Sequence, residues 1–180
     1  MSAINTTIQT FADWHHFQVQ KVFAISQQSE SPELAEWLSI ETTGEFEDEA
    51  WPPDFFVDLR QQLSLMHTTW NEAELTVNFI AQLLGSVRFH GPGFNTFSQR
   101  PLEATFQFGD HTYQLKGLVD WMVATGDFSP KLPFFFLHEY KRTQLVPADP
   151  LGQLLIAMLA ARAAANSPYP EYGVYVIGKH

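Results

Sequence analysis

The chain contains no cysteine. This absence excludes disulfide bonds, thiolate metal sites and a cysteine nucleophile, and it leaves the redox compartment undecided. Basic residues are also scarce: 10 Lys and Arg stand against 20 Asp and Glu, for a formal net charge of −10. Because phosphate contacts need clustered Lys and Arg, this balance counts against a broad nucleic-acid-binding surface.

A long apolar run is missing as well. No stretch approaches the ~20 residues of a membrane span, and the N-terminus lacks the basic and apolar regions of a signal peptide. We therefore expect a cytoplasmic protein with no membrane partner. The 180 residues are 45% hydrophobic and include 16 Phe, a composition that predicts one globular domain with a sizeable core.

The first half of the chain is typical of helices. Apolar residues recur near helical spacing in four segments: 4–25, 32–40, 53–66 and 71–84. Ser31 and Asn71 are suitable N-caps for the second and fourth of these segments. The acidic run 45–49 is predicted to be a solvated loop.

The second half changes to the pattern of strands. Segments 102–108 and 111–124 flank Gly109-Asp110, a two-residue turn typical of hairpins. A third strand is predicted at 133–141, a helix at 151–165 and a last strand at 172–177. Because a strand–helix–strand crossover makes a parallel pair, this order predicts an α/β fold with a mixed sheet flanked by helices.

Three charged residues lie in these apolar strands: Asp120, Glu139 and Lys141. Strand alternation places Glu139 and Lys141 on one face, and it places Asp120 with Leu118 and Met122, opposite Trp121. If the two strands are neighbours, the carboxylates of Asp120 and Glu139 can meet. Two such carboxylates stay ionised only beside a cation or a protonated base, and a hard cation such as Mg²⁺ or Mn²⁺ fits oxygen ligands.

A structural ion pair between Lys141 and one of the acids is the simpler interpretation of these charges. The run 134–137, however, is apolar on both faces, as in a central buried strand. A charge cluster in that setting is costly unless it binds something. We therefore favour a functional site and keep the ion pair as the alternative.

These residues resemble the PD-(D/E)XK nuclease superfamily. Asp120 matches the first acid of its pattern, although Val119 stands where the pattern has proline, and Glu139-Tyr140-Lys141 matches the acid-x-lysine. Glu72 and Glu74 are candidates for the helix acid, and Glu72 is preferred because it lies at the edge of the apolar stripe. Gln153 matches a glutamine on the following helix. The resemblance covers residues ~70–180 and includes nothing in 1–66.

The resemblance implies a restriction-endonuclease-like core over residues 67–180, preceded by a helical extension, 1–66, that packs on it. It implies a Mg²⁺- or Mn²⁺-dependent phosphodiester hydrolase, with DNA as the expected substrate. Asp120, Glu139, Glu72 and the Tyr140 carbonyl would hold the metal. Lys141 would activate the attacking water, and Gln153 would orient Lys141 or the phosphate. A further strand or helix is expected after residue 180.

Two other functions stay open. The net charge of −10 favours a catalytically inactive protein of the same fold, acting as an interaction or regulatory module with a protein partner or a second copy. A metal-dependent hydrolase of a small phosphoester or nucleotide would need no basic groove.

Overall fold

The structure is a computed structural model that describes residues 5–39, 52, 54–66, 68–87, 89–141, 149–166 and 171–177. The predicted acidic loop 45–49 lies outside these residues. Among the described helices, none is long and apolar enough to cross a membrane.

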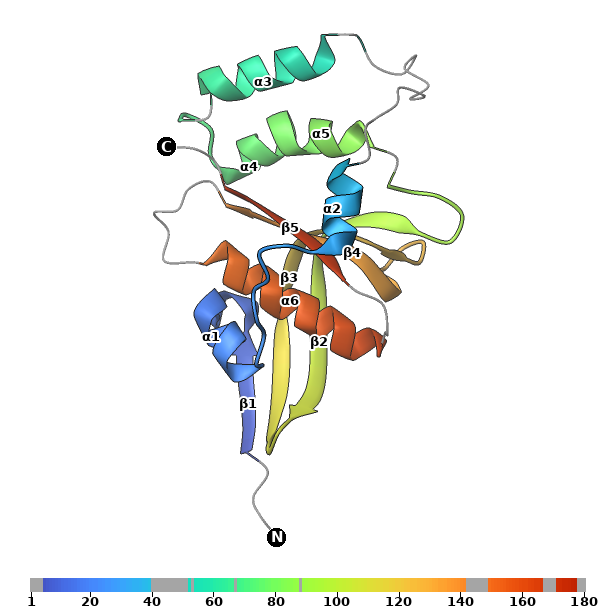
Figure 1. The fold of residues 1–180 in the computed structure, drawn as a ribbon. Helices are drawn as coiled ribbons and strands as arrows, with labels where there is room; N and C mark the ends of the chain where they lie inside the picture. The colour runs from blue at the N-terminus through green and yellow to red at the C-terminus, as the bar shows by residue number, and fades with distance from the viewer. Residues whose placement is uncertain are drawn as a thin grey trace.

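The described strands form one five-stranded mixed sheet (Figure 1). They are β1 (Asn5–Thr10), β2 (Asn95–Phe108), β3 (His111–Thr125), β4 (Lys131–Lys141) and β5 (Tyr172–Ile177). Strand β3 is central, because it pairs with β1 in parallel and with β2 and β4 in antiparallel. Strands β4 and β5 are parallel, as the predicted helical crossover requires. The predicted α/β class and mixed sheet are therefore confirmed.

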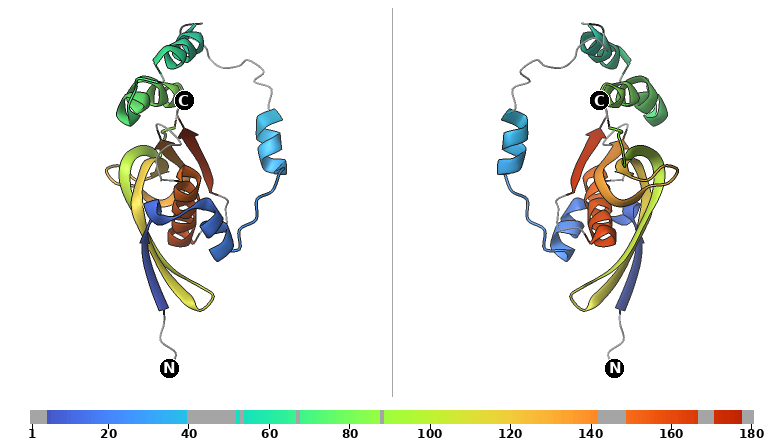
Figure 2. Two further views of the ribbon diagram at one scale, coloured as in Figure 1. Left: turned by 90° about the vertical axis from the view of Figure 1, so that its left-hand side faces the viewer. Right: turned by 90° about the vertical axis from the view of Figure 1, so that its right-hand side faces the viewer.

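All but the last of the described helices precede the β2–β3 hairpin, and the last one lies between β4 and β5 in the chain. They are η1 (Phe11–Asp13), α1 (His16–Val22), α2 (Pro32–Ser39), α3 (Phe55–Met66), α4 (Glu72–Leu75), the π-helical η3 (Thr76–Ile80), α5 (Ala81–Gly85) and α6 (Pro150–Ala165). Helices α1 and α6 lie on one side of the sheet, and α3 to α5 lie beyond its upper end in Figure 1. Helix α2 stands apart from the sheet (Figure 2).

The predicted helix over residues 4–25 is wrong in its first part. Residues Asn5–Thr10 form β1, which pairs with His111–Lys116 of β3. The sequence NTTIQT is rich in β-branched residues, which favour strands, and β3 supplies the partner. Since β1 belongs to the sheet, the N-terminal segment is not purely helical. The division of the chain at residue 66 stays a prediction.

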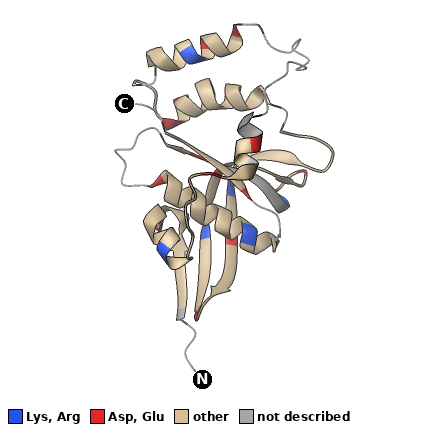
Figure 3. Ribbon diagram, in the orientation of Figure 1, with Lys and Arg blue, Asp and Glu red and all other residues tan. Residues whose placement is uncertain are grey.

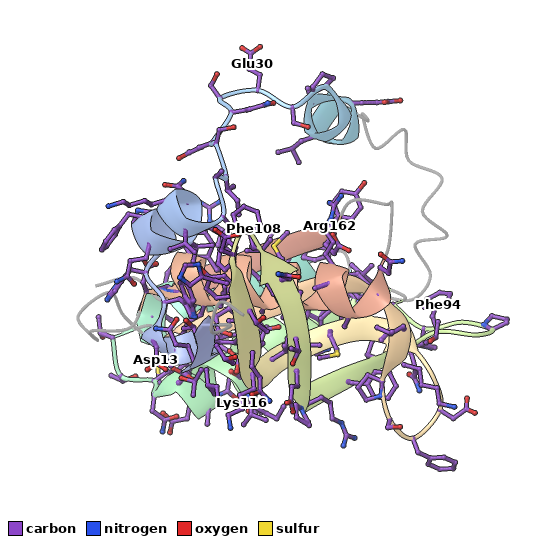
Figure 4. All side chains as sticks on the ribbon, turned by 90° about the horizontal axis from the view of Figure 1, so that it is seen from below. Asp13, Glu30, Phe94, Phe108, Lys116 and Arg162 are labelled. Atoms are coloured by element: carbon purple, nitrogen blue, oxygen red, sulfur yellow. The ribbon has the colours of Figure 1, made fainter. Side chains whose placement is uncertain are left out.

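Two apolar cores hold the elements together. The larger one joins η1, α1 and α6 to the sheet, and its fully buried members include Val19, Leu115, Met122 and Ile156. Side chains crowd between α1 and the strands in the view from below (Figure 4). The smaller core joins Trp121, Val123 and Tyr140 to the apolar side of the α4–α5 segment.

Asp149 ties the N-terminus of α6 to the N-terminus of α1. Its Oδ1 accepts the Gly152 N–H at 3.0 Å, and its Oδ2 accepts the His16 backbone N–H at 2.8 Å and contacts His16 Nδ1 at 2.6 Å. Gly152 allows this approach, since a Cβ there would overlap the Trp14 carbonyl oxygen and lie 2.7 Å from the His16 nitrogen. A single carboxylate therefore caps α6 and fixes the entry to α1.

Replacing Gly152 by alanine should destabilise the protein by about 2 kcal/mol or more, because the new methyl group meets rigid backbone atoms. Urea unfolding measures the change. Gly85→Ala is the matched control, since a Cβ there meets nothing within 4 Å and alanine favours a helix by up to ~1 kcal/mol. Equal stability of the two variants would contradict the close approach at Gly152.

Asp149→Ala should cost about 1–2 kcal/mol at neutral pH, as expected for a lost N-cap. Burial alone would raise the pKa of Asp149, but the N–H groups of His16 and Gly152 and the His16 ring together lower it below the ordinary value of 3.8. The folded state thus holds this proton less tightly than the unfolded chain. The contribution is present above pH 3.8 and is lost as the pH falls through the lower folded-state pKa.

Unfolding free energies of wild type and Asp149→Ala between pH 7 and pH 2 test this sign. The gap between the two proteins should shrink only in the acid range. Asp127→Ala, in an exposed turn, controls for the loss of one negative charge. A gap that stays constant down to pH 2 would rule out the proposed linkage.

Candidate functional site

Strands β2 and β3 each turn two consecutive side chains toward one pocket. Ser98 and Gln99 of β2 line it, and so do Asp120 and Trp121 of β3. The flanking residues Phe97, Leu102, Val119 and Met122 all pack in the larger core. In each strand, the side chains that point to the larger core therefore shift from one alternate set of residues to the other. The two shifts lie side by side in the sheet, because Ser98 pairs with Trp121.

The strand-alternation prediction for Asp120 is corrected by this change of face. Met122 packs in the larger core, whereas Asp120 lines the pocket beside Trp121. The physical reason is an irregular backbone at the paired position. Gln99 has φ +51°, in the left-handed region, and such a residue interrupts the regular alternation of a strand.

The pocket has a volume of about 360 Å³, within the range of small-molecule sites. One wall comes from the sheet and the other from the segment α4–η3–α5 and the chain that follows it. The described lining residues are Glu72, Thr76, Ile80, Ala81, Leu84, Gly85, Val87, Phe89, His90, Thr96, Ser98, Gln99, Asp120, Trp121 and Tyr140. Two carboxylates thus face a largely apolar wall, and no Lys or Arg is among these described residues.

Asp120 sits where strands β3 and β4 separate. The β3–β4 ladder ends at Trp121 and His138. Beyond that point the Asp120 Oδ2 accepts the Tyr140 N–H at 2.8 Å, in place of a backbone carbonyl. Its Oδ1 accepts the Gln99 Nε2–H at 2.7 Å. Each oxygen accepts one of these bonds and keeps further lone-pair capacity for another ligand.

The backbone of Tyr140 faces the same opening. In a strand the N–H and C=O of one residue point to the same side, so the Tyr140 carbonyl lies on the side of β4 that faces Asp120. The Tyr140 side chain is buried in the smaller core. Burial, and then the charges of Asp120 and Glu139, raise the pKa of its hydroxyl far above the ordinary value of 10. Both carboxylates therefore act on one buried phenol.

Glu72 and Glu74 have different roles at the start of α4. Glu74 forms a capping box with Asn71: its N–H donates to Asn71 Oδ1 at 2.9 Å, and its Oε2 accepts the Asn71 N–H at 2.7 Å. This confirms Asn71 as the N-cap. Glu72 instead lines the pocket together with Asp120 and Tyr140. Glu74 thus serves the helix cap, whereas Glu72 lies at the pocket.

Two of the remaining predicted site residues do not line the pocket. Glu139 is 8% exposed and Gln153 is 7% exposed, and neither is among its described lining residues. The Lys141 side chain lies outside the described part of the structure. Within that part, no three His, Asp or Glu side chains gather as a metal-binding group. Asp120, Glu72 and the Tyr140 backbone are therefore the predicted ligands that share the pocket.

Sequence reasoning missed three features of the pocket. Gln99 gave no signal, because its role depends on a left-handed backbone inside a strand. His90 was overlooked next to the Gly91-Pro92-Gly93 turn. The third feature is the π-helical turn Thr76–Ile80, which interrupts the predicted α-helix at the pocket wall. Such π segments are frequent at functional sites, but their position is not visible in residue spacing.

Comparisons with known proteins do not assign the chain to a family. No protein-family model matches the chain, and a search of curated proteins finds no match either.

Tyr140 should make the protein sensitive to alkaline pH. Because its pKa is raised in the folded state, the folded protein keeps this proton while the unfolded chain loses it. Stability should therefore fall as the pH rises above 10, and Tyr140→Phe should remove this part of the loss. Urea unfolding between pH 7 and pH 11.5 provides the measurement. Tyr175→Phe, on the exposed side of β5, is the control. Parallel pH profiles of wild type and Tyr140→Phe would contradict the shift.

Proposed function

We propose that this protein is a divalent-metal-dependent phosphodiester hydrolase with a restriction-endonuclease-like core, and that DNA is its substrate. The observation that carries the proposal is the pocket at the point where β3 and β4 separate. There the Asp120 carboxylate, the Glu72 side chain and the Tyr140 backbone line one site. The resemblance of Asp120, Glu139-Tyr140-Lys141 and Gln153 to the nuclease pattern supplies the reaction class.

The donors of this site suit a hard cation. Two carboxylates and a backbone carbonyl are oxygen ligands, which Mg²⁺ and Mn²⁺ prefer. Mg²⁺ commonly binds one or two carboxylates, keeps several waters and takes the rest of its shell from phosphate. A pocket with two carboxylates and hydroxyl groups in its walls agrees with this mode of coordination. Such coordination does not require the three-residue metal-binding group that is absent from the described residues.

The roles of the chain's own residues follow from their positions. Asp120 and Glu72 would hold the cation from opposite walls of the pocket. Bound metal would lower the pKa of an attacking water and offset charge on the reacting phosphate. The apolar side chains of Ile80, Leu84 and Phe89 would exclude bulk water and so strengthen these electrostatic contacts.

Roles for Glu139, Lys141 and Gln153 rest on the sequence resemblance. Glu139 would complete the metal shell, Lys141 would orient the attacking water, and Gln153 would orient Lys141 or the phosphate. The charge of Glu139 already acts on Tyr140, as does the charge of Asp120.

Cleavage assays with single- and double-stranded DNA in Mg²⁺ or Mn²⁺ test the proposal. Asp120→Ala, Glu72→Gln and Lys141→Ala should each lower the rate by about 100-fold or more, because metal-based stabilisation amounts to several kcal/mol. Glu74→Gln is the matched control on the same helix, since a glutamine preserves the capping box and Glu74 does not line the pocket.

Two outcomes would contradict the proposal. One is equal cleavage by wild type, Asp120→Ala and Lys141→Ala. The other is equal loss in Glu72→Gln and Glu74→Gln, which would point to a damaged helix instead of a lost ligand. Short nucleotide esters should be assayed in parallel, because a pocket of about 360 Å³ also suits a small phosphoester.

A second candidate function is a non-catalytic interaction module. The net charge of −10 supports it, and the described Lys and Arg are scattered over several elements instead of gathered on one face (Figure 3). Calorimetric titration with Mg²⁺ and Mn²⁺ separates the two candidates. Absence of binding at millimolar metal would favour the interaction module.

A further inference from the structure

Gln99 carries a backbone conformation that a strand does not require. Its φ of +51° places it among three non-glycine residues with positive φ in the described part of the chain. The other two, Ala24 and Asn166, lie just after helices α1 and α6, where left-handed residues are common. Gln99 alone of these lies inside a strand. An outlier of this kind at a pocket is a reason to look for a functional role.

The left-handed backbone has a direct consequence for the side chain. Adjacent residues of a regular strand point to opposite faces, yet Ser98 and Gln99 both line the pocket. The irregular backbone thus delivers the Gln99 amide to the face where Asp120 stands. There the Gln99 Nε2–H donates to Asp120 Oδ1 at 2.7 Å. The left-handed backbone of Gln99 therefore makes the hydrogen bond from Gln99 to Asp120 possible.

Gln99 and Tyr140 together fix the orientation of the Asp120 carboxylate. One oxygen is held by Gln99 from β2, and the other is held by the Tyr140 N–H from β4. With both oxygens held, the carboxylate plane is fixed relative to the pocket, while lone pairs stay available for a cation. Partners of this kind, which orient a metal ligand, commonly change metal affinity by about 10–100-fold.

We infer that Gln99 of β2 is a positioning residue for Asp120. It holds the Asp120 carboxylate in the orientation in which that carboxylate bridges the gap between β3 and β4 and can bind a metal. Its effect on metal binding rests on the proposed function, whereas its hold on Asp120 does not. Gln99 would touch neither metal nor substrate for this purpose. It would act through the carboxylate that does.

Two variants separate positioning from ordinary structural support. Gln99→Gly removes the amide but relieves the left-handed backbone, since glycine adopts positive φ readily. Gln99→Met keeps the length of the side chain and the strained backbone but loses the donor. Ala24→Gly is the matched control, because it relieves a nearly identical φ of 52° at an exposed position away from the pocket.

The first measurement is amide hydrogen exchange at Tyr140 in metal-free protein. Both Gln99 variants should speed exchange by about fivefold to tenfold, because a less fixed Asp120 accepts the Tyr140 N–H less well. Ala24→Gly should leave it unchanged. The second measurement is Mn²⁺ affinity by calorimetry, which should fall by about 10–100-fold in Gln99→Gly and Gln99→Met. The urea midpoint of Gln99→Gly should equal or exceed that of wild type.

Unchanged Tyr140 exchange in both Gln99 variants would overturn the inference. A loss of Mn²⁺ affinity in Gln99→Gly that is matched by a lower urea midpoint, and is absent from Gln99→Met, would also overturn it in favour of a folding defect. If wild type binds no Mn²⁺ but both variants speed Tyr140 exchange, the proposed function fails while the hold of Gln99 on Asp120 is supported. The two failures are therefore distinguishable.

Discussion

The site depends on the way the Asp120 carboxylate bridges two strands that no longer pair. Where the β3–β4 ladder ends, Asp120 accepts the Tyr140 N–H and so replaces a missing backbone carbonyl. A buried backbone donor left without an acceptor would be costly. The strands can therefore separate without that cost, and their separation brings the Tyr140 backbone to a pocket. The Asp120 side chain therefore satisfies a backbone donor of β4 and also places a carboxylate in the pocket.

The opening also needs walls, and the helices supply them. The segment from Glu72 to Gly85 places Glu72 and apolar side chains opposite the sheet. Its first turn is fixed by the capping box of Asn71 and Glu74, and its middle by a π-helical turn. The result is a site of negative charge against an apolar wall. Such a setting attracts a cation more strongly than an open acidic surface does, because screening by water is weaker there.

The rest of the sheet is held from its other face. Asp149 caps α6 and receives the His16 N–H, so the crossover helix and the N-terminal helices share one anchor. Gly152 lets the two backbones approach, and the larger core fills the space behind them. This anchored layer gives the sheet a fixed support, which allows the irregular backbone at Gln99 to persist.

The sequence by itself determined the α/β class, the β2–β3 hairpin, the crossover helix and the last strand, because periodicity and turn residues are local properties. It also singled out Asp120 and Glu72. It assigned residues 5–10 to a helix, since the parallel partner of β1 lies about a hundred residues away. Only the tertiary structure decided that Asp120 and Trp121 share a face, that Glu139 stays outside the pocket and that Gln99 holds Asp120. The hold of Gln99 on Asp120, and the face that Asp120 shares with Trp121, depend on an irregular backbone in a neighbouring strand, which no spacing in a single chain encodes.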